Sequence, residues 1–231
     1  MPVASKRSST AKTPARKAAK PATAESADKA DKTERAPSTS RIMDAAVHLF
    51  ATRGYANSTL EEVAAMAGFT KGAVYYYFKS KERLLLDVLS TIEARSIDAT
   101  AAAIRSQGGT PSEQLDEFVR LQTRWAARYP EDLAILMLMS IETARTKSKA
   151  RTLMLRMYGK LGGVLETIIE AGKKSGEFSA EQDTRDTVLY LQAVHDGNMM
   201  IWYRSGTDPE TGRKLTRATL SGFAHAVRRN A

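Results

Sequence analysis

Apolar residues along this chain recur at spacings of three and four, which is the period of one face of an α-helix. The clearest example is a short segment after residue 58, in which one apolar stripe consists of Leu60, Val63, Ala64 and Ala67. No segment shows the alternation of apolar and polar residues that a half-buried strand requires. The chain is therefore predicted to be all-α. The predicted helices open at Ser40, Ser58 or Thr59, Thr70, Ser80, Pro111, Pro130, Ser148, Asp183 or Thr184, and Asp208.

Two of the predicted helices are short and follow one another closely between residues 58 and 81. The hydroxyl of Ser58 or Thr59 can accept hydrogen bonds from the free N–H groups at the start of the first helix. Glu61 or Glu62, three residues further on, can complete a capping box. These signals predict that the first helix begins at this point.

A glycine and a threonine separate the two helices. Gly68 tolerates positive φ without steric cost, so the chain can turn sharply there. Thr70 can then cap a second helix, in which Val74 and Phe78 stand four residues apart and can both pack inward. Two helices joined by a tight turn are typical of a helix-turn-helix, although such pairs also occur in all-α proteins that do not bind DNA.

The outward face of the second helix carries the residues predicted to contact DNA. Small side chains in its first turn would allow close approach to base edges in the major groove. An exposed cluster of tyrosines flanked by lysines favours a contact surface, with Tyr77 expected to be mostly structural. The predicted DNA-binding residues are Ser58, Thr59, Thr70, Lys71, Gly72, Ala73, Tyr75, Tyr76, Lys79 and Lys81.

Three of these side chains are predicted to read bases. Lys71 would favour guanine O6 and N7, Tyr76 could stack on or hydrogen-bond a base, and the methyl group of Ala73 could touch thymine. Lys79 and Lys81, at the helix exit, suit phosphates, which fix the register but carry no sequence information. Because one helix reads few bases, specificity implies two copies that read half-sites about 34 to 36 Å apart.

The residues from Arg41 to Leu89 resemble the DNA-binding domain of the tetracycline-repressor (TetR) family of bacterial regulators. The resemblance rests on the pattern T-x-x-x-V-A-x-x-A-G-F-T-K-G-A-V-Y-x-Y-F-x-S-K-E-x-L, which begins at Thr59. Beyond Ala94 the chain resembles the family only in its helical pattern and its length. The resemblance implies that Thr59, Tyr75 and Lys81 hold phosphates and that Lys71, Ala73 and Tyr76 face bases.

Two positions depart from the family pattern. Tyr76 stands where many relatives carry histidine, and Phe69 stands where a smaller aliphatic residue is usual. The operator sequence of a relative therefore cannot be transferred to this chain.

The chain is predicted to have three parts: a disordered basic tail over 1–38, a helix-turn-helix domain over 39–94, and a helical ligand-binding and dimerisation domain over 95–231. The tail is rich in Ala, Lys, Ser, Thr and Pro and has almost no large apolar residue. It carries nine cations and four acids, so its net charge of +5 is over half of the total of +9. The tail is interpreted either as an arm that adds salt-dependent DNA affinity or as a solubilising extension.

The composition excludes several kinds of site. The 231 residues are 42% apolar and contain no cysteine, which excludes disulfides, thiol nucleophiles and cysteine zinc sites. The three histidines, at residues 48, 195 and 225, are far apart in sequence, so no metal site and no cofactor are predicted. The densest apolar run, from Leu133 to Met139, is well below the ~20 residues of a membrane span. A location in the cytoplasm, on the nucleoid, is expected.

The second domain is predicted to bind a small-molecule effector and to dimerise. By the resemblance, the last two helices form a four-helix bundle with those of a second copy. Bulky apolar residues mixed with a few polar groups could line a cavity at the centre of the domain, although for any single one of them ordinary core packing is the commoner explanation. The predicted cavity residues are Trp125, Met137, Ser140, Ile141, Tyr158, Leu161, Gln192 and His195.

The sequence thus predicts a dimeric repressor that an inducer releases from a palindromic operator on double-stranded DNA. An activator would carry the same DNA-reading residues, and a nucleoid-type architectural protein would bind mainly through its tail. No catalytic residues are predicted. The run from Gly172 to Ser175 ends a helix and lacks the first glycine of a phosphate loop, and His195 with Asp196 lacks a recognisable nucleophile.

Overall fold

The computed structural model describes residues 24–227, with side chains from residue 38 onward, and no strand occurs among them. The contacts divide the chain between Ser38 and Thr39 into two units. The predicted tail over 1–38 lies largely outside the described residues, as do the side chains of the proposed basic arm. The backbone is helical from Ala24, however, so the first helix begins before the predicted start at Ser40. Ala, Glu and Lys, which favour helix, are frequent in this stretch.

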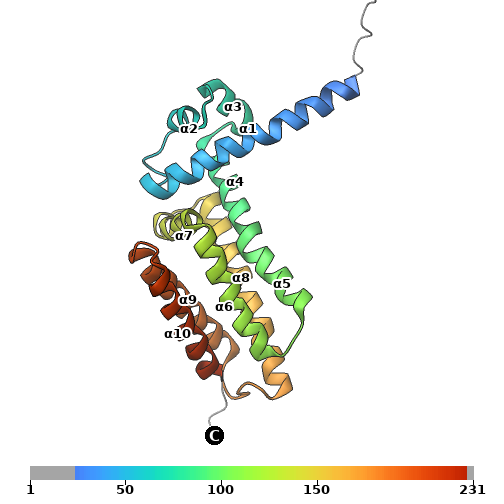
Figure 1. The fold of residues 1–231 in the computed structure, drawn as a ribbon, viewed down its shortest axis with the longest axis vertical. Coiled ribbons are helices and arrows are strands. Elements are labelled where there is room, and N and C mark those ends of the chain that lie inside the picture. Colours follow the sequence, from blue (N-terminus) through green and yellow to red (C-terminus); the bar gives the residue numbers. More distant parts are fainter. Residues whose placement is uncertain (1–23, 228–231) are drawn as a thin grey trace, which may run out of the picture. The chain divides into compact units, whose positions relative to one another are not determined.

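The helices follow the predicted order (Figure 1). The predicted starts at Pro111 and Ser148 are confirmed: Pro111 is the first residue of α6, and Ser148 caps α8. The sequence did not predict that Thr110 caps α6 through a capping box with Glu113. Of the two alternatives at the next start, Asp183 is the cap. The elements are α1 (Ala24–Arg53), α2 (Leu60–Ala67), α3 (Lys71–Phe78), α4 (Lys81–Glu93), η1 (Ala94–Asp98), α5 (Ala99–Gln107), α6 (Pro111–Arg128), α7 (Pro130–Thr143), α8 (Lys149–Ser175), α9 (Thr184–Arg204) and α10 (Pro209–Val227).

The helix predicted from Ser80 to Arg105 is one continuous run with an interruption that the sequence did not predict. One turn of π-helix, η1, separates α4 from α5. Such a turn admits an extra residue into an α-helix and is frequent at functional sites. We call α4, η1 and α5 together the linking helix, because α4 belongs to the core of α1 to α3 while α5 packs on α6.

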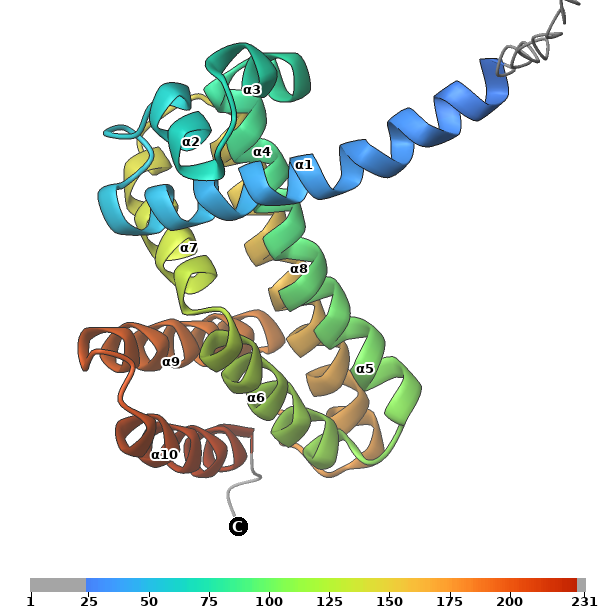
Figure 2. The same cartoon turned by 45° about the horizontal axis from the view of Figure 1, so that its top comes forward.

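The second domain is built around α8, which packs against α4, α6, α7 and α9. Figure 2 shows α8 running alongside the linking helix. The apolar residues of α7 from Leu133 to Ile141 suggest a helix buried on several sides, but its second half is partly exposed. Its first half is buried, at Leu133, Ala134 and Ile135, but Ile141 is 71% exposed in the single chain. The apolar run of α7 therefore extends beyond the core that covers it.

Polar contacts connect α7 to the linking helix and to α1. Arg95, in η1, forms a bidentate ion pair with the buried carboxylate of Asp132 in α7. Its guanidinium also lies over the ring of Tyr129 at 4.5 Å. Burial raises the pKa of the Asp132 carboxyl, an effect that the Arg95 guanidinium opposes. A second contact joins His48 Nδ1 of α1 to Glu131 Oε1 of α7 at 2.7 Å.

Two glycines of α8 provide a matched test of the packing. A Cβ at Gly172 would lie 2.1 Å from Cδ2 of the buried Phe178, whereas a Cβ at Gly163 would meet no atom within 4 Å. We expect Gly172→Ala to lower the free energy of unfolding by about 1 to 3 kcal/mol through overpacking. Gly163→Ala should raise it by about 0.5 to 1 kcal/mol, because alanine favours helix. Urea denaturation measures both changes, and stabilisation by Gly172→Ala would contradict the placement of Phe178.

Candidate DNA-binding surface and central cavity

The turn between α2 and α3 has the predicted geometry. Of the alternatives at its start, Thr59 is the cap: its Oγ1 accepts from Glu62 N at 3.2 Å, and Glu62 Oε2 accepts from Thr59 N at 2.8 Å. Gly68 has φ +72°, a left-handed conformation that glycine adopts without strain. Thr70 caps α3 and accepts from Ala73 N at 3.2 Å. These short-range bonds define two eight-residue helices that would not be stable alone.

Ser58 does not belong to the exposed surface, contrary to the prediction. Its side chain is 1% exposed, and its Oγ donates to the carbonyl of Gly54 at 2.8 Å. A hydroxyl in this position satisfies the backbone where α1 ends and cannot reach DNA in this conformation. Thr59 is therefore the exposed residue at the start of α2.

Lys81 also has a different environment from the one predicted. Its Nζ donates to the carbonyls of Tyr55 at 2.8 Å, Ser58 at 2.7 Å and Ala56 at 3.3 Å. The ammonium also lies 4.4 Å from the centre of the Tyr55 ring. An ammonium group has three hydrogens, so these carbonyls occupy its donors. The cation holds the loop between α1 and α2, and it would have to leave that loop to bind a phosphate.

The face of α3 divides as predicted. Val74 and Phe78 are buried, whereas Tyr75 is 40% and Tyr76 is 53% exposed. Gly72 is exposed and Ala73 is half-buried, so the first turn of α3 presents little bulk. The surface therefore offers a close approach at one end of the helix and two aromatic rings further along it.

The lysines of this surface contact its tyrosines. Lys71 Nζ lies 5.6 Å from the centre of the Tyr75 ring, and Lys79 Nζ lies 5.3 Å from the centre of the Tyr76 ring. Lys71 also pairs with Glu61 of α2, which lowers the pKa of Glu61 and raises that of Lys71. Both partners of this pair are exposed, so water weakens it and another acceptor could replace Glu61. We call Thr59, Thr70, Lys71, Gly72, Ala73, Tyr75, Tyr76 and Lys79 the reading surface.

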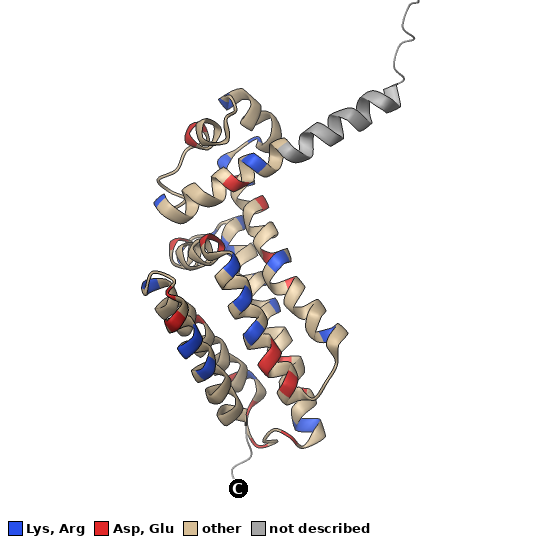
Figure 3. Cartoon of the chain, in the orientation of Figure 1, with Lys and Arg blue, Asp and Glu red and all other residues tan. Residues whose placement is uncertain are grey.

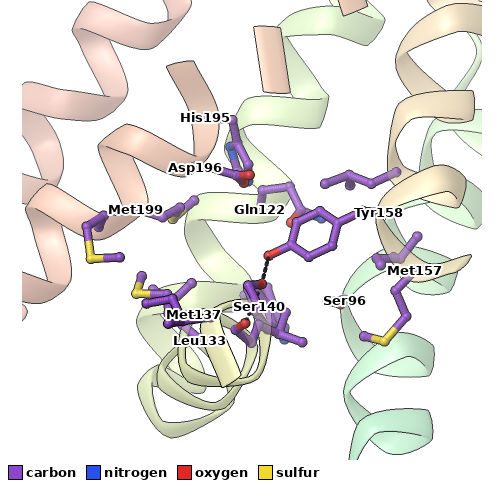
Figure 4. A pocket seen from close by; sticks show the side chains of 16 residues that line it. Ser96, Gln122, Leu133, Met137, Ser140, Met157, Tyr158, His195, Asp196 and Met199 are labelled. Atoms are coloured by element: carbon purple, nitrogen blue, oxygen red, sulfur yellow. Dashed lines mark hydrogen bonds between the residues drawn. The ribbon is translucent and has the colours of Figure 1, made fainter. Parts of the chain in front are cut away.

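A cavity of about 180 Å³ lies among η1, α6, α7, α8 and α9 (Figure 4). We call it the central cavity. Its wall contains seven of the eight residues predicted to line such a site: Trp125, Met137, Ser140, Ile141, Tyr158, Leu161 and His195.

The eighth predicted residue, Gln192, is not part of this wall. Its Nε2 donates to the carbonyl of Tyr158 at 3.1 Å, and its amide packs against Gly162. The amide therefore connects α9 to α8.

Polar groups are few in the central cavity. Figure 4 shows the Tyr158 hydroxyl directed at Ser140, 3.2 Å away. Trp125 Nε1 is buried and has no hydrogen-bond acceptor among the described residues. Burial lowers the pKa of His195 to about 4, so this ring is neutral at pH 7, and burial raises the pKa of Asp196 to about 6.

The sequence did not single out several other residues of the wall. Ser96 and Ile97 line it from η1, the π-helical turn that the sequence did not predict. Gln122 donates from Nε2 to Thr100 Oγ1 at 2.8 Å, and its place on the apolar face of α6 was a visible signal. Asp196 was visible only as the neighbour of His195.

Within residues 24–227, no group of three acidic or histidine side chains is placed to hold a metal ion. No helix of this region is long and apolar enough to cross a bilayer.

Two family models match the chain. Residues 42–88 match the model described as bacterial regulatory proteins, tetR family, and residues 108–219 match the C-terminal domain described as tetracyclin repressor-like. The chain is 32% identical over 182 residues to the HTH-type transcriptional repressor NicS of Pseudomonas putida, covering 79% of this chain and 78% of NicS.

Solved structures of regulators share the fold. The crystal structure of the MbdR regulator from Azoarcus sp. CIB superposes with a TM-score of 0.73 at 28% identity, over 83% of this chain and all of that one. A transcriptional regulator from Saccharomonospora viridis, solved in complex with choline, has the same TM-score of 0.73 at 22% identity and covers 84% of this chain. That second similarity concerns the fold alone.

Lys81 binds the carbonyls of a loop, whereas Lys79 is exposed, and substitution of each lysine tests this difference. We expect Lys81→Gln to lower the free energy of unfolding by about 1 to 3 kcal/mol, because the carbonyls of the loop lose a charged donor. Lys79→Gln should leave it nearly unchanged, since the exposed Lys79 side chain only approaches the Tyr76 ring. Thermal and urea denaturation of both variants measure this, and equal stability of the two would show that Lys81 does not hold the loop.

Proposed function

The chain belongs to the TetR family of bacterial transcriptional regulators, and from that premise we propose that it is a dimeric repressor of an inverted-repeat operator. A small molecule bound in the central cavity would release it from DNA. The observation that supports DNA reading is the exposed face of α3, where the tyrosines stand beyond a capped, small-residue first turn. Because its target is chromosomal DNA, we expect the protein to act in the cytoplasm, on the nucleoid.

We assign the reading surface to two kinds of contact. Lys71, Ala73 and Tyr76 would face base edges, and each well-formed bidentate contact discriminates by about 1 to 3 kcal/mol. Thr59, Thr70, Tyr75 and Lys79 lie around them and would bind phosphates, which set the register. For Lys71 to reach a guanine, it must exchange Glu61 for the base, and the exposure of their ion pair permits that exchange.

The proposed dimer contact is an apolar face of α9. In the single chain Leu189 is 67%, Tyr190 55% and Ile201 45% exposed. The small residues Ala193 and Gly197 lie between them at helical spacing, which allows a second helix to approach closely. Exposed apolar stripes of this kind mark protein interfaces. Two copies would then place two α3 helices on one side of the duplex.

The proposed release mechanism depends on the linking helix. Its π-helical turn η1 lines the central cavity with Ser96 and Ile97, and the same helix continues into α4 beneath the reading surface. An effector that displaces Ile97 would move α4 and change the spacing of the two half-site readers. To take occupancy from nearly full to nearly empty, the effector must prefer the DNA-incompetent state by roughly 10⁴-fold, about 5.5 kcal/mol. Repression, and not activation, is favoured by the similarity to the repressor NicS.

Selection of binding sites from random duplex DNA tests the proposed DNA reading. We expect enrichment of an inverted repeat, and we expect Tyr76→Ala to weaken binding to it by about 5- to 150-fold, the equivalent of 1 to 3 kcal/mol. Binding of that variant to unrelated DNA should be unchanged, because Tyr76 would read bases.

The matched control for this experiment is Lys79→Gln, which should weaken binding to both DNAs alike and flatten the salt dependence. Tight binding without any enriched sequence would instead favour an architectural DNA-binding protein.

A charge on α9 tests the dimer contact. A Cβ at Gly197 meets no atom within 4 Å, so Gly197→Glu should leave the folded protomer intact while placing a carboxylate in the proposed interface. We expect sedimentation to show a dimer for the unmodified protein and a monomer for Gly197→Glu. Gly159→Glu, at an equally open site on α8, is the control and should stay dimeric. A Gly197→Glu dimer as tight as the unmodified one would exclude this face.

A further inference from the structure

A second cavity, of about 550 Å³, lies between α6, α9 and α10. Its apolar wall includes Val119 and Ala126 of α6, Met199 and Trp202 of α9, and Leu215 and Leu220 of α10. The volume lies within the range of about 300 to 1,000 Å³ that is typical of small-molecule sites. We call it the second cavity.

The charged side chains that line the second cavity are all basic. Arg120 of α6 and Arg213 and Arg217 of α10 line it, and no acidic side chain is among its lining residues. Figure 3 shows basic positions on both α6 and α10. Arg120 and Arg217 form no ion pair within the described part of the chain. Hydrogen bonds from Thr211 lower the pKa of the Asp208 carboxyl, and the charge of Arg213 adds to that effect. Arg213 and Arg217 are one helical turn apart, so their guanidinium groups can act together.

Three other polar side chains of the wall already have hydrogen-bond partners. Asn198 Nδ2 donates to Thr219 Oγ1 at 2.8 Å, and Thr216 Oγ1 donates to the carbonyl of Gly212 at 2.8 Å. The Trp202 indole donates from Nε1 to the carbonyl of Asp208 at 3.1 Å. The donors left for a ligand are therefore mainly those of the arginines.

We propose that the second cavity binds an amphipathic anion. Its carboxylate or phosphate group would bind Arg120, Arg213 and Arg217, because the guanidinium fork matches both groups. Its apolar part would lie against Met199 and Trp202. The central cavity differs in charge: no arginine or lysine is among its lining residues, Asp196 is its acidic one and His195 is neutral, so an anion is disfavoured there.

The second cavity is also connected to the proposed regulation. His195 and Met199 line both cavities and form their common wall. A methionine side chain adapts readily to a new neighbour, so an anion in the second cavity changes the shape available to an effector in the central one. The proposed dimer face uses Leu189, Tyr190 and Ile201, and none of these lines the second cavity. This connection rests on the proposed function, whereas the binding of the anion does not.

The two tryptophans of the chain allow each cavity to be observed alone. Trp125 lines the central cavity and Trp202 lines the second one. Trp125→Phe leaves Trp202 as the only reporter, and Trp202→Phe leaves Trp125. Each full-length variant is titrated with dodecanoate, dodecyl phosphate, dodecanol and dodecyltrimethylammonium below their micellar concentrations, and the tryptophan fluorescence is recorded.

We expect dodecanoate or dodecyl phosphate to change the Trp202 signal in the Trp125→Phe protein, with binding at least tenfold tighter than that of the alcohol or the cation. A stronger response to one of the two anions identifies the headgroup. The double variant Arg213→Gln, Arg217→Gln should weaken anion binding at least tenfold. Lys214→Gln, on the same helix and paired with Glu210 at 2.8 Å, is the control and should have no effect.

Three results would overturn the proposal: equal binding of dodecanol and the anions, a response from Trp125 alone, or no response from either reporter. Circular dichroism checks the fold of the double variant, and Arg120→Gln, on a different helix, repeats the test if that variant is unfolded. Operator binding is measured separately on the same preparations. Its absence would refute the proposed function and leave the anion site standing.

Discussion

The buried ion pair between Arg95 and Asp132 is the contact on which the relation between reader and cavity depends. A carboxylate that is almost fully buried is tolerated only when it is paired and hydrogen-bonded. Asp132 meets that condition through a bidentate contact with Arg95, one residue before the part of η1 that lines the central cavity. The pair therefore fixes α7 to the linking helix at the level of the cavity.

The π-helical turn gives this arrangement a second property. Ser96 and Ile97 of η1 line the central cavity, while Glu93, just before η1, pairs with Arg156 and Lys160 of α8. The linking helix thus combines ion pairs to α7 and to α8 with a face that lines the cavity.

The sequence was sufficient where local chemistry decides the outcome. The caps at Thr59 and Thr70 and the left-handed Gly68 follow from residue types at fixed offsets, and the pattern of α3 correctly divided buried from exposed side chains. The sequence did not predict which polar side chains bind protein carbonyls instead of facing water. The Ser58 hydroxyl and the Lys81 ammonium both bind carbonyls of the loop between α1 and α2. Only the tertiary course of that loop, which no periodicity encodes, makes those acceptors available.

The two cavities also differ in how far the sequence could predict them. Most of the central wall could be predicted because apolar stripes on α6, α7 and α8 must meet somewhere, and a few polar residues interrupt them. The second cavity could not, because Arg120 on one helix and Arg213 and Arg217 on another look like ordinary solvated faces until α6 and α10 are placed side by side. Placing them together concentrates positive charge over an apolar floor. Since repulsion between like charges disfavours such a cluster, an anion that neutralises it would also stabilise the packing of α10 on α6, and through Met199 the wall of the central cavity.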